Sequence, residues 1–308
     1  MVETKKKSWL LIGTGNIANH YAKALNYLFK KDNFYVIPSS ELSKSYYNFS
    51  KKYNNFIKIN YDEINELNNL SPLICTPEDN HIFIIKKLLK TNAKYIYCEK
   101  PLTLNINELK NLKKYSDRLY GLFNRRFYEI QKYLTKSISN VLFVNAKISI
   151  SRTQNNFREN FLPHFLDFIL HTFPNISNNF KMGNLSSSIK NINYSSDVFN
   201  KKLIPINITI LESKFVPSTI EIILSDQKVI NLMTLEKLAV YKYSISKSAS
   251  FTNQINQIQD MYLDEEELTT NGFKPGFLQL LNAIKNDDIS KMHNFDDALN
   301  LSNLINKL

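Results

Sequence analysis

The segment WLLIGTGNIA, Trp9 to Ala18, constrains the fold of this chain more than any other stretch. Three apolar residues run into Gly13, Gly15 and Ala18, and an apolar pattern of helical period follows. In a GxGxxA turn between a strand and a helix, the first glycine permits a sharp turn and the second leaves room for a pyrophosphate. The small third residue lets the helix pack against the strand, and the helix N-terminus faces the phosphates. The pattern therefore predicts a dinucleotide site made of Gly13, Thr14, Gly15, Asn16 and Ile17.

The residues after the second predicted strand, 34–38, bear on the choice of cofactor. An acidic residue at this point hydrogen-bonds the ribose 2′-OH of NAD, whereas a serine or a basic residue leaves room for the 2′-phosphate of NADP. Here Ser39 and Ser40 come first, with Glu41 next and Lys44 beyond. The two serines favour NADP, and Glu41 keeps NAD open.

Apolar segments of strand length alternate with helical patterns through residue 123. This alternation predicts an α/β fold with a doubly wound parallel sheet, whose ligand lies beyond the carboxyl ends of the strands. Polar residues follow the predicted strands at these ends. We expect the following to line the cofactor site: Ser39, Ser40, Thr76, Pro77, His81, Glu99, Lys100 and Asn124. For His81, a structural role at the start of a helix is an equal alternative.

The second half of the chain has a different pattern. Segments with β-branched alternation, at 141–152, 204–213, 219–225, 228–233 and 238–246, are separated by longer polar connections. Helical patterns cover 161–173, 275–286 and 296–308. We expect a Rossmann domain over residues 1–122 and an α+β domain with a large, open, mostly antiparallel sheet over 123–308. The Ser/Asn-rich stretch 184–200 is expected to be a loop or a short edge excursion.

Composition narrows the functional classes. The 308 residues carry a net charge of +11, but the lysines are scattered among asparagines on predicted helix faces, which does not favour nucleic-acid binding. No apolar run reaches the length of a membrane span. Cys75 and Cys98 have no partner at metal-ligand spacing, so we expect no metal site. A cytoplasmic protein with a small-molecule substrate is expected.

Four motifs occur in order along the first domain: GTGNIA, then Thr76-Pro77 with His81, then Glu99-Lys100-Pro101, then Asn124-Arg125-Arg126-Phe127. In sequence and spacing they resemble the glucose-fructose oxidoreductase / inositol dehydrogenase (Gfo/Idh/MocA) family of NAD(P)-dependent oxidoreductases. The resemblance implies a second domain whose open sheet commonly packs against another subunit, and hence a homodimer or homotetramer.

The resemblance also implies a catalytic triad. Asp167 and His171 are four residues apart on a predicted helix and therefore share a face. The family carries such an Asp-x-x-x-His in its cleft together with the lysine of the EKP motif, here Lys100. Oxidation of an alcohol needs a base for the hydroxyl proton; His171 suits this role by its ordinary pKa, and Lys100 is the alternative. Asp167 would orient the imidazole or accept from a substrate hydroxyl.

Other residues of this region are candidate substrate contacts, namely Arg126, Arg152 and His164. Arg126 has the alternative of pairing with a carboxylate. In the family, a Gly-rich segment usually precedes the Asp-x-x-x-His helix. Residues 162–166 of this chain are bulkier, so the resemblance does not predict which sugar would be the substrate.

The resemblance thus predicts hydride transfer between NAD(P) and a hydroxyl or carbonyl carbon of a sugar, cyclitol or nucleotide-linked sugar. The basic charge favours an anionic substrate, as in cell-surface saccharide synthesis. The alternative is a non-catalytic regulator that senses a dinucleotide or sugar on the same fold.

Overall fold

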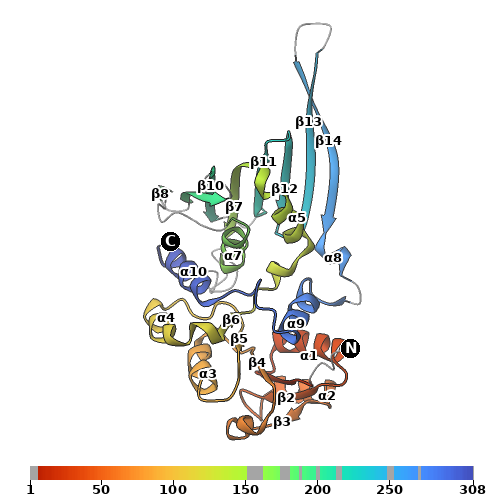
Figure 1. Ribbon diagram of the computed structural model, residues 1–308, viewed down its shortest axis with the longest axis vertical. Coiled ribbons are helices and arrows are strands. Elements are labelled where there is room, and N and C mark those ends of the chain that lie inside the picture. The colour runs from red at the N-terminus through yellow and green to blue at the C-terminus, as the bar shows by residue number, and fades with distance from the viewer. Residues whose placement is uncertain are drawn as a thin grey trace. The chain divides into compact units, whose positions relative to one another are not determined.

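The computed structural model describes residues 6–150, 162–173, 181–186, 189–198, 202–212, 217–247, 253–269 and 272–307. The chain forms two compact units, one of Met1–Phe127 with Asn271–Leu308 and one of Tyr128–Thr270 (Figure 1). Within the described ranges, none of the helices combines the length and the apolar character that crossing a membrane requires.

The first unit is built on a parallel sheet with strand order β3-β2-β1-β4-β5-β6. Its strands are β1 (Ser8–Ile12), β2 (Asn33–Ile37), β3 (Ile57–Lys58), β4 (Leu70–Ile74), β5 (Ile96–Cys98) and β6 (Leu119–Gly121). Its α-helices are α1 (Asn16–Leu28), α2 (Lys44–Lys52), α3 (His81–Leu88), α4 (Ile106–Leu112), α9 (Phe277–Lys285) and α10 (Phe295–Lys307). Short 3₁₀ helices are η1 (Tyr61–Glu66), η2 (Glu78–Asn80), η3 (Lys113–Arg118) and η4 (Asn124–Phe127). This order, with every pair parallel, confirms the predicted doubly wound sheet.

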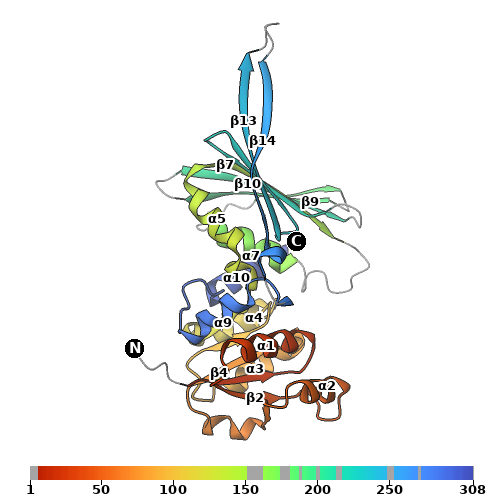
Figure 2. The ribbon, with the colours of Figure 1, turned by 90° about the vertical axis from the view of Figure 1, so that its right-hand side faces the viewer.

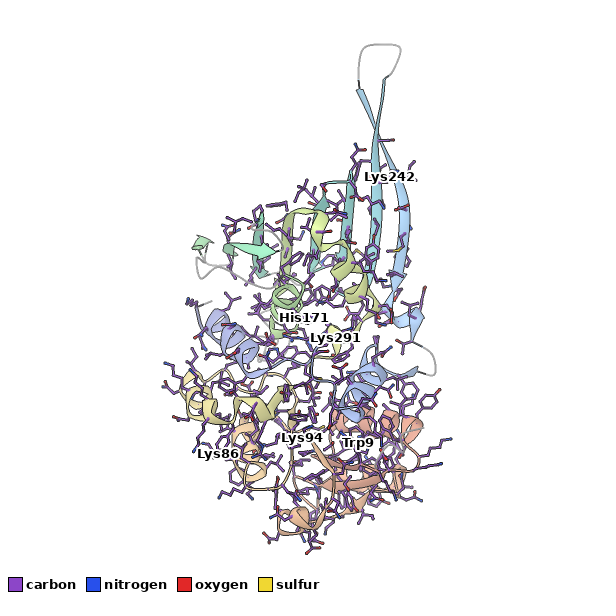
Figure 3. All side chains as sticks on the ribbon, viewed as in Figure 1. Trp9, Lys86, Lys94, His171, Lys242 and Lys291 are labelled. Carbon is purple, nitrogen blue, oxygen red and sulfur yellow. The ribbon has the colours of Figure 1, made fainter. Side chains whose placement is uncertain are left out.

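Side-chain alternation along β1 explains why helices cover both faces of this sheet. Trp9 and Leu11 belong to one buried cluster, which includes residues of α1 and α9. Leu10 and Ile12 belong to the other, with residues of α3, α4 and α10. Because successive side chains of a strand point to opposite faces, an uninterrupted apolar strand requires apolar cover on both sides. Trp9, the only tryptophan, lies in this core and is labelled in Figure 3.

The C-terminal helices divide between the same two clusters. Phe277 and Leu281 of α9 pack with Tyr21 of α1, while Phe295 and Ala298 of α10 pack in the cluster that contains α4. For this reason residues 271–308 belong to the first unit, whereas we expected them in the second domain. Sequence order places these helices after the second sheet, but their apolar faces are buried on the first.

The second unit contains an eight-stranded sheet with strand order β14-β13-β12-β11-β7-β10-β9-β8 (Figure 2). Its strands are β7 (Val141–Ile150), β8 (Lys181–Ser186), β9 (Ile189–Val198), β10 (Lys202–Glu212), β11 (Thr219–Leu224), β12 (Lys228–Met233), β13 (Lys237–Lys247) and β14 (Asn253–Asp264). Its helices are α5 (Glu129–Ser137), η5 (Ile138–Asn140), α7 (Leu162–Thr172) and α8 (Glu265–Leu268). Only the β7–β10 pair is parallel among the described strand pairs of this sheet, which confirms the mostly antiparallel α+β prediction.

Of the two alternatives for residues 184–200, the loop is wrong, because most of this stretch lies in β8 and β9. These strands do lie at one edge of the sheet, but β9 is a full strand and not a short excursion. β9 pairs with β10 over ten residues, from Ile189–Leu211 to Val198–Lys202. Ile192 is buried, while Asn191 and Asn193 on the opposite face are not. The strand therefore follows the inside–outside alternation of a sheet, with asparagine where a β-branched residue is usual. β14 was not predicted at all.

Candidate functional site

The Gly-rich turn after β1 has the backbone geometry that a pyrophosphate site requires. Gly13 has a φ of +104°, and a Cβ at this position would lie 3.0 Å from the Cys75 carbonyl oxygen. Gly15 precedes α1 in extended conformation, with φ −72° and ψ −170°, and a Cβ there would meet nothing within 4 Å. Gly13 is thus needed for the turn itself, whereas Gly15 leaves open space at the N-terminus of α1. The residues present fit a dinucleotide phosphate at this place.

The end of β2 carries hydroxyl groups and a neutralised carboxylate. Ser39 and Ser40 are exposed, and the Glu41 carboxylate is 2.7 Å from the Lys58 ammonium of β3. Ser45, near the start of α2, has its hydroxyl 3.2 Å from that of Thr14 in the Gly-rich turn. The parallel pairing of β2 with β3 brings Lys58 to this edge. Sequence reasoning missed Lys58, because its partner lies seventeen positions earlier and no local pattern links them.

The predicted cofactor residue His81 connects two of the strand-end loops. Its imidazole is buried, with Nδ1 2.9 Å from the Pro101 carbonyl oxygen and Nε2 2.9 Å from the Thr76 carbonyl oxygen. Burial lowers the pKa of His81, and the two carbonyls oppose that shift. Both ring nitrogens of His81 face protein carbonyls. These contacts agree with a structural role, in which His81 holds the loops after β4 and β5 together.

The loop after β5 holds a buried carboxylate beside Lys100. Glu99 accepts a hydrogen bond of 2.7 Å from the Tyr21 hydroxyl through Oε1, and its Oε2 accepts one of 3.3 Å from the Lys100 backbone N–H. Burial lowers the pKa of the Lys100 ammonium, and the Glu99 charge opposes that shift. Tyr21 was not predicted as a site residue. The available signal was a tyrosine on the apolar face of the first helix, since a buried phenol needs a hydrogen-bond partner.

The motif after β6 is mainly structural. The Arg126 guanidinium is buried, 2.9 Å from the Asp297 carboxylate, and donates to the Met292 carbonyl oxygen at 3.2 Å. Its Nη2 is also 3.0 Å from Nδ1 of His293. Asn124 donates to the Pro275 carbonyl at 2.9 Å. Arg126 therefore anchors the C-terminal segment to the first unit, and the carboxylate-pairing alternative accounts for it better than substrate binding does.

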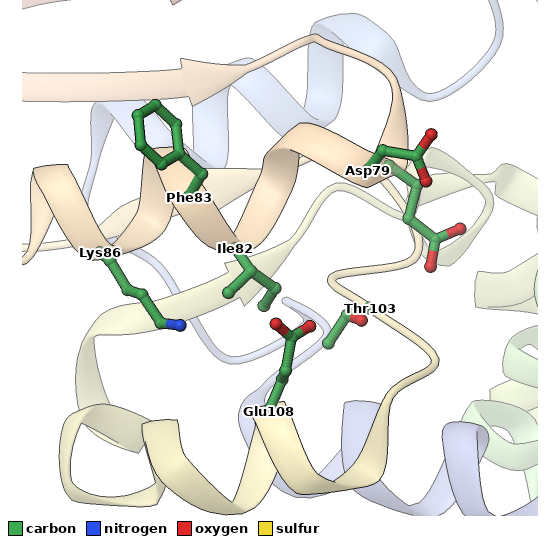
Figure 4. A pocket seen from close by; sticks show the side chains of 7 residues that line it. Asp79, Ile82, Phe83, Lys86, Thr103 and Glu108 are labelled. Atoms are coloured by element: carbon green, nitrogen blue, oxygen red, sulfur yellow. The ribbon is translucent and has the colours of Figure 1, made fainter.

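A pocket of about 390 Å³ lies between α3 and α4 (Figure 4). Its lining residues are Glu78, Asp79, Ile82, Phe83, Lys86, Thr103 and Glu108. Three carboxylates against one ammonium disfavour a phosphate-bearing ligand at this place. This pocket is therefore a poor candidate for the dinucleotide phosphates. The described residues contain no group of three or more His, Cys, Asp or Glu side chains able to hold a metal ion.

In the second unit, α7 carries the Asp-x-x-x-His pair. Asp167 is buried, 2% exposed, while His164 and His171 are partly exposed; His171 is labelled in Figure 3. The helical spacing places Asp167 and His171 on one face of α7, as predicted. Thr172 is held by Gln131 of α5, whose amide donates to the threonine hydroxyl at 3.0 Å. Arg152 lies outside the described residues.

Comparison with protein families supports the identity of the first domain. The model for the oxidoreductase family with NAD-binding Rossmann fold, Gfo/Idh/MocA, matches residues 7–122. The match covers the parallel-sheet part of the first unit, including the Gly-rich turn and the EKP motif. A comparison with curated proteins gave no match.

Several solved structures have a fold similar to that of nearly the whole chain. A dehydrogenase (MviM) from Clostridium difficile is 16% identical over 98% of both chains, with a TM-score of 0.72. The super-repressor mutant of Gal80p from Saccharomyces cerevisiae is 13% identical over 98% of this chain and 95% of its own, with a TM-score of 0.68. Levoglucosan dehydrogenase in complex with NADH and L-sorbose is 14% identical over the same shares, with a TM-score of 0.67. At these identities the similarity shows the fold.

Proposed function

We propose that this protein is an NAD(P)-dependent oxidoreductase that transfers a hydride between the cofactor and a hydroxyl or carbonyl carbon of a sugar, cyclitol or nucleotide-linked sugar. The observation that carries the proposal is the open space at Gly15, at the N-terminus of α1 and beside a Gly13 that only glycine fits. The family match over residues 7–122 supports the cofactor class. The fold similarity to a sugar dehydrogenase supports the substrate class.

The chemistry follows from three side chains. The bound nicotinamide supplies the carbon that accepts or donates the hydride. His171 takes the hydroxyl proton as general base, and Asp167 on the same face of α7 orients its ring. Lys100 hydrogen-bonds the reacting oxygen and stabilises the charge that develops there. Because burial lowers the pKa of Lys100, this group is the second candidate for the proton transfer.

Two variants test this assignment. Lys100→Ala and His171→Ala should each abolish nicotinamide reduction with sugar substrates and leave dinucleotide affinity nearly unchanged. Lys90→Ala, which removes an exposed lysine of the first unit, is the matched control and should retain full turnover. Retained turnover in both site variants would overturn the mechanism.

NADP is the proposed cofactor, with NAD as the alternative. Ser39 and Ser40 leave room for a 2′-phosphate, and the ion pair with Lys58 neutralises Glu41, the nearest carboxylate to them in sequence. Lys58→Ala leaves the Glu41 charge unopposed and should weaken NADP binding more than NAD binding. Glu41→Ala should have the opposite effect on this ratio. Calorimetric titration with both dinucleotides measures it, and equal changes for the two cofactors would contradict the assignment.

A sensing regulator is the second candidate, because the fold is also that of the Gal80p super-repressor mutant. The arrangement of Asp167 and His171 on one helix face, in addition to Lys100, favours the enzyme. A wild-type protein that binds dinucleotide and sugar but reduces no nicotinamide with any sugar, cyclitol or nucleotide-linked sugar would favour the regulator.

Two further features belong to the proposal. The net charge of +11 favours an anionic substrate; a kcat/KM that falls with salt for phosphorylated but not for neutral sugars would support this. We also propose a homodimer or homotetramer formed through the second sheet. Light scattering of the wild type measures the assembly, and a monomer at micromolar concentration would contradict it.

A further inference from the structure

A buried hydrogen bond joins the first helix to the EKP loop. The Tyr21 hydroxyl donates to Oε1 of Glu99 at 2.7 Å, and both residues are almost inaccessible, with exposures of 0% and 8%. Burial raises the pKa of the Tyr21 phenol well above its ordinary value, so the hydroxyl remains a donor throughout the neutral range. A carboxylate in such a place is ionised only where donors and cations compensate its lost hydration.

The position of Tyr21 follows from the sequence of α1. Ala18, Tyr21, Ala22 and Leu25 are buried and fall on one face of the helix at spacings of three and four residues. The Phe277 ring of α9 packs on the Tyr21 ring with centroids 4.7 Å apart. The phenol is therefore held on the helix that begins at the Gly-rich turn, and its oxygen reaches the end of β5.

Groups from several elements of the first unit compensate the hydration that the buried Glu99 carboxylate has lost. Burial raises the pKa of the Glu99 carboxyl, while the hydrogen bond from Tyr21, the Lys100 backbone N–H and the charges of Lys100 and Lys274 lower it. The thiols of Cys75 and Cys98 are also near this carboxylate, and burial raises the pKa of both, so they remain neutral. Tyr21 contributes most to the lowering.

The Glu99 charge in turn acts on Lys100. Burial, Arg125 and Lys274 favour the neutral amine, whereas Glu99 and Glu78 favour the ammonium. Among these opposing groups Glu99 has the largest effect in favour of the charged form. We propose that Tyr21 is a positioning residue that keeps Glu99 ionised, and thereby keeps Lys100 in its charged form. The importance of that charge for turnover rests on the proposed function; the charge itself does not.

Tyr21→Phe removes only the hydroxyl. Without this donor Glu99 binds a proton more readily, and Lys100 loses part of the negative charge that holds its proton. The pH midpoint for acylation of Lys100 should move to lower pH. The folded protein is treated briefly with acetic anhydride and then digested, and mass spectrometry of the peptides measures the label on each lysine. At a fixed pH below the midpoint, Lys100 should react about three to ten times faster than in the wild type, because a lower pKa raises the fraction of Lys100 that is the neutral, reactive amine. Lys90, exposed on the same unit, is the internal reference.

The matched control is Tyr53→Phe. Tyr53 is also a buried tyrosine whose hydroxyl donates to α1, to the Asn19 carbonyl oxygen at 2.9 Å, but it does not contact Glu99. This variant should leave the Lys100 midpoint unchanged. Glu99→Gln keeps the volume and removes the charge, so it should lower the midpoint at least as far as Tyr21→Phe, and it replaces that variant if the latter does not fold.

The outcomes separate this inference from the proposed function. A Lys100 midpoint that is the same in the wild type, Tyr21→Phe and Glu99→Gln would overturn the inference whether or not the protein turns over a substrate. A shift in Glu99→Gln alone would also overturn the role of Tyr21. Where turnover is measured, the alkaline limb of kcat/KM should move to lower pH in Tyr21→Phe by the same amount as the labelling midpoint. Labelling shifts without any dehydrogenase activity would support the inference and count against the proposed function.

Discussion

Replacement of Gly15 by alanine separates cofactor binding from the stability of the fold. The backbone of Gly15 is extended, with φ −72° and ψ −170°, and alanine adopts this conformation without strain. An added Cβ meets no atom within 4 Å. Alanine restricts the unfolded chain more than glycine does, which favours folding by about 0.4 to 1 kcal/mol. Gly15 is also the N-cap of α1, where alanine is less favourable than glycine by a similar amount. Gly15→Ala should therefore leave the free energy of unfolding within about 1 kcal/mol of the wild-type value.

The same methyl group occupies the space that we assign to the pyrophosphate. Displacement of a phosphate oxygen loses at least one hydrogen bond to a charged group, about 1.5 to 3 kcal/mol. This corresponds to a roughly 10- to 150-fold increase in Kd for the dinucleotide. The expected variant therefore has a stability close to that of the wild type and binds its cofactor more weakly.

Urea unfolding and calorimetric titration with NAD and NADP measure the two quantities on the same preparation. A variant that binds either dinucleotide within about threefold of the wild type, at native stability, would refute the placement of the pyrophosphate. Weaker binding accompanied by a loss of stability larger than about 2 kcal/mol, the most that an N-cap change costs, would refute the argument from open space at Gly15, because the methyl group would then disturb the turn itself.

Three further substitutions test the other parts of the site. Gly13→Ala should lower the free energy of unfolding by about 2 to 5 kcal/mol, through strain at φ +104° and contact with the Cys75 carbonyl; urea unfolding measures it, and unchanged stability would contradict the geometry. Arg126→Met should cost about 3 kcal/mol with KM unchanged, the lower end of the range for a broken buried ion pair, because Asp297 is 36% exposed; a raised KM at native stability would instead indicate substrate binding. His81→Ala leaves a carbonyl of the two loops without its donor and should cost about 1 to 3 kcal/mol in thermal unfolding, while a stable variant with lost cofactor affinity would restore the predicted ligand contact.

The parts of the candidate site that the sequence predicts are those determined by residues close together in the chain. The Gly-rich turn is specified by residues 13–18, because the turn, the pyrophosphate space and the close helix are all local requirements. The alternation of strands and helices then places the polar residues after β2, β4 and β5 at one edge of a parallel sheet. The predicted fold class followed from these two observations and is confirmed.

The strand β9, which was not predicted, has side-chain hydrogen bonds to strands from distant segments of the chain. On the second sheet, Asn193 donates to Asn191 at 2.7 Å, Asn191 to Asn207 at 2.8 Å, and Asn207 to Asn145 at 2.8 Å. These amides satisfy one another across β9, β10 and β7. Asparagine ordinarily favours turns because its side chain competes for backbone partners. Where neighbouring strands offer amides instead, an Asn-rich segment becomes a strand, and nothing within the segment itself reveals this.

The difference between local sequence patterns and contacts with distant segments also applies to the predicted site residues. Glu99 was predicted as a cofactor contact because it ends a strand, yet both of its oxygens bind groups of the protein, the Tyr21 hydroxyl and the Lys100 amide. Glu41 likewise pairs with Lys58 of the neighbouring strand. A position at a strand end therefore predicts which residues lie at the proposed ligand-binding edge of the sheet. It does not predict which of these residues contact the ligand, because that depends on the hydrogen bonds and ion pairs they make with other parts of the protein. For Lys100, the backbone N–H donates to the Glu99 carboxylate, and that carboxylate is in turn bound by Tyr21 of α1.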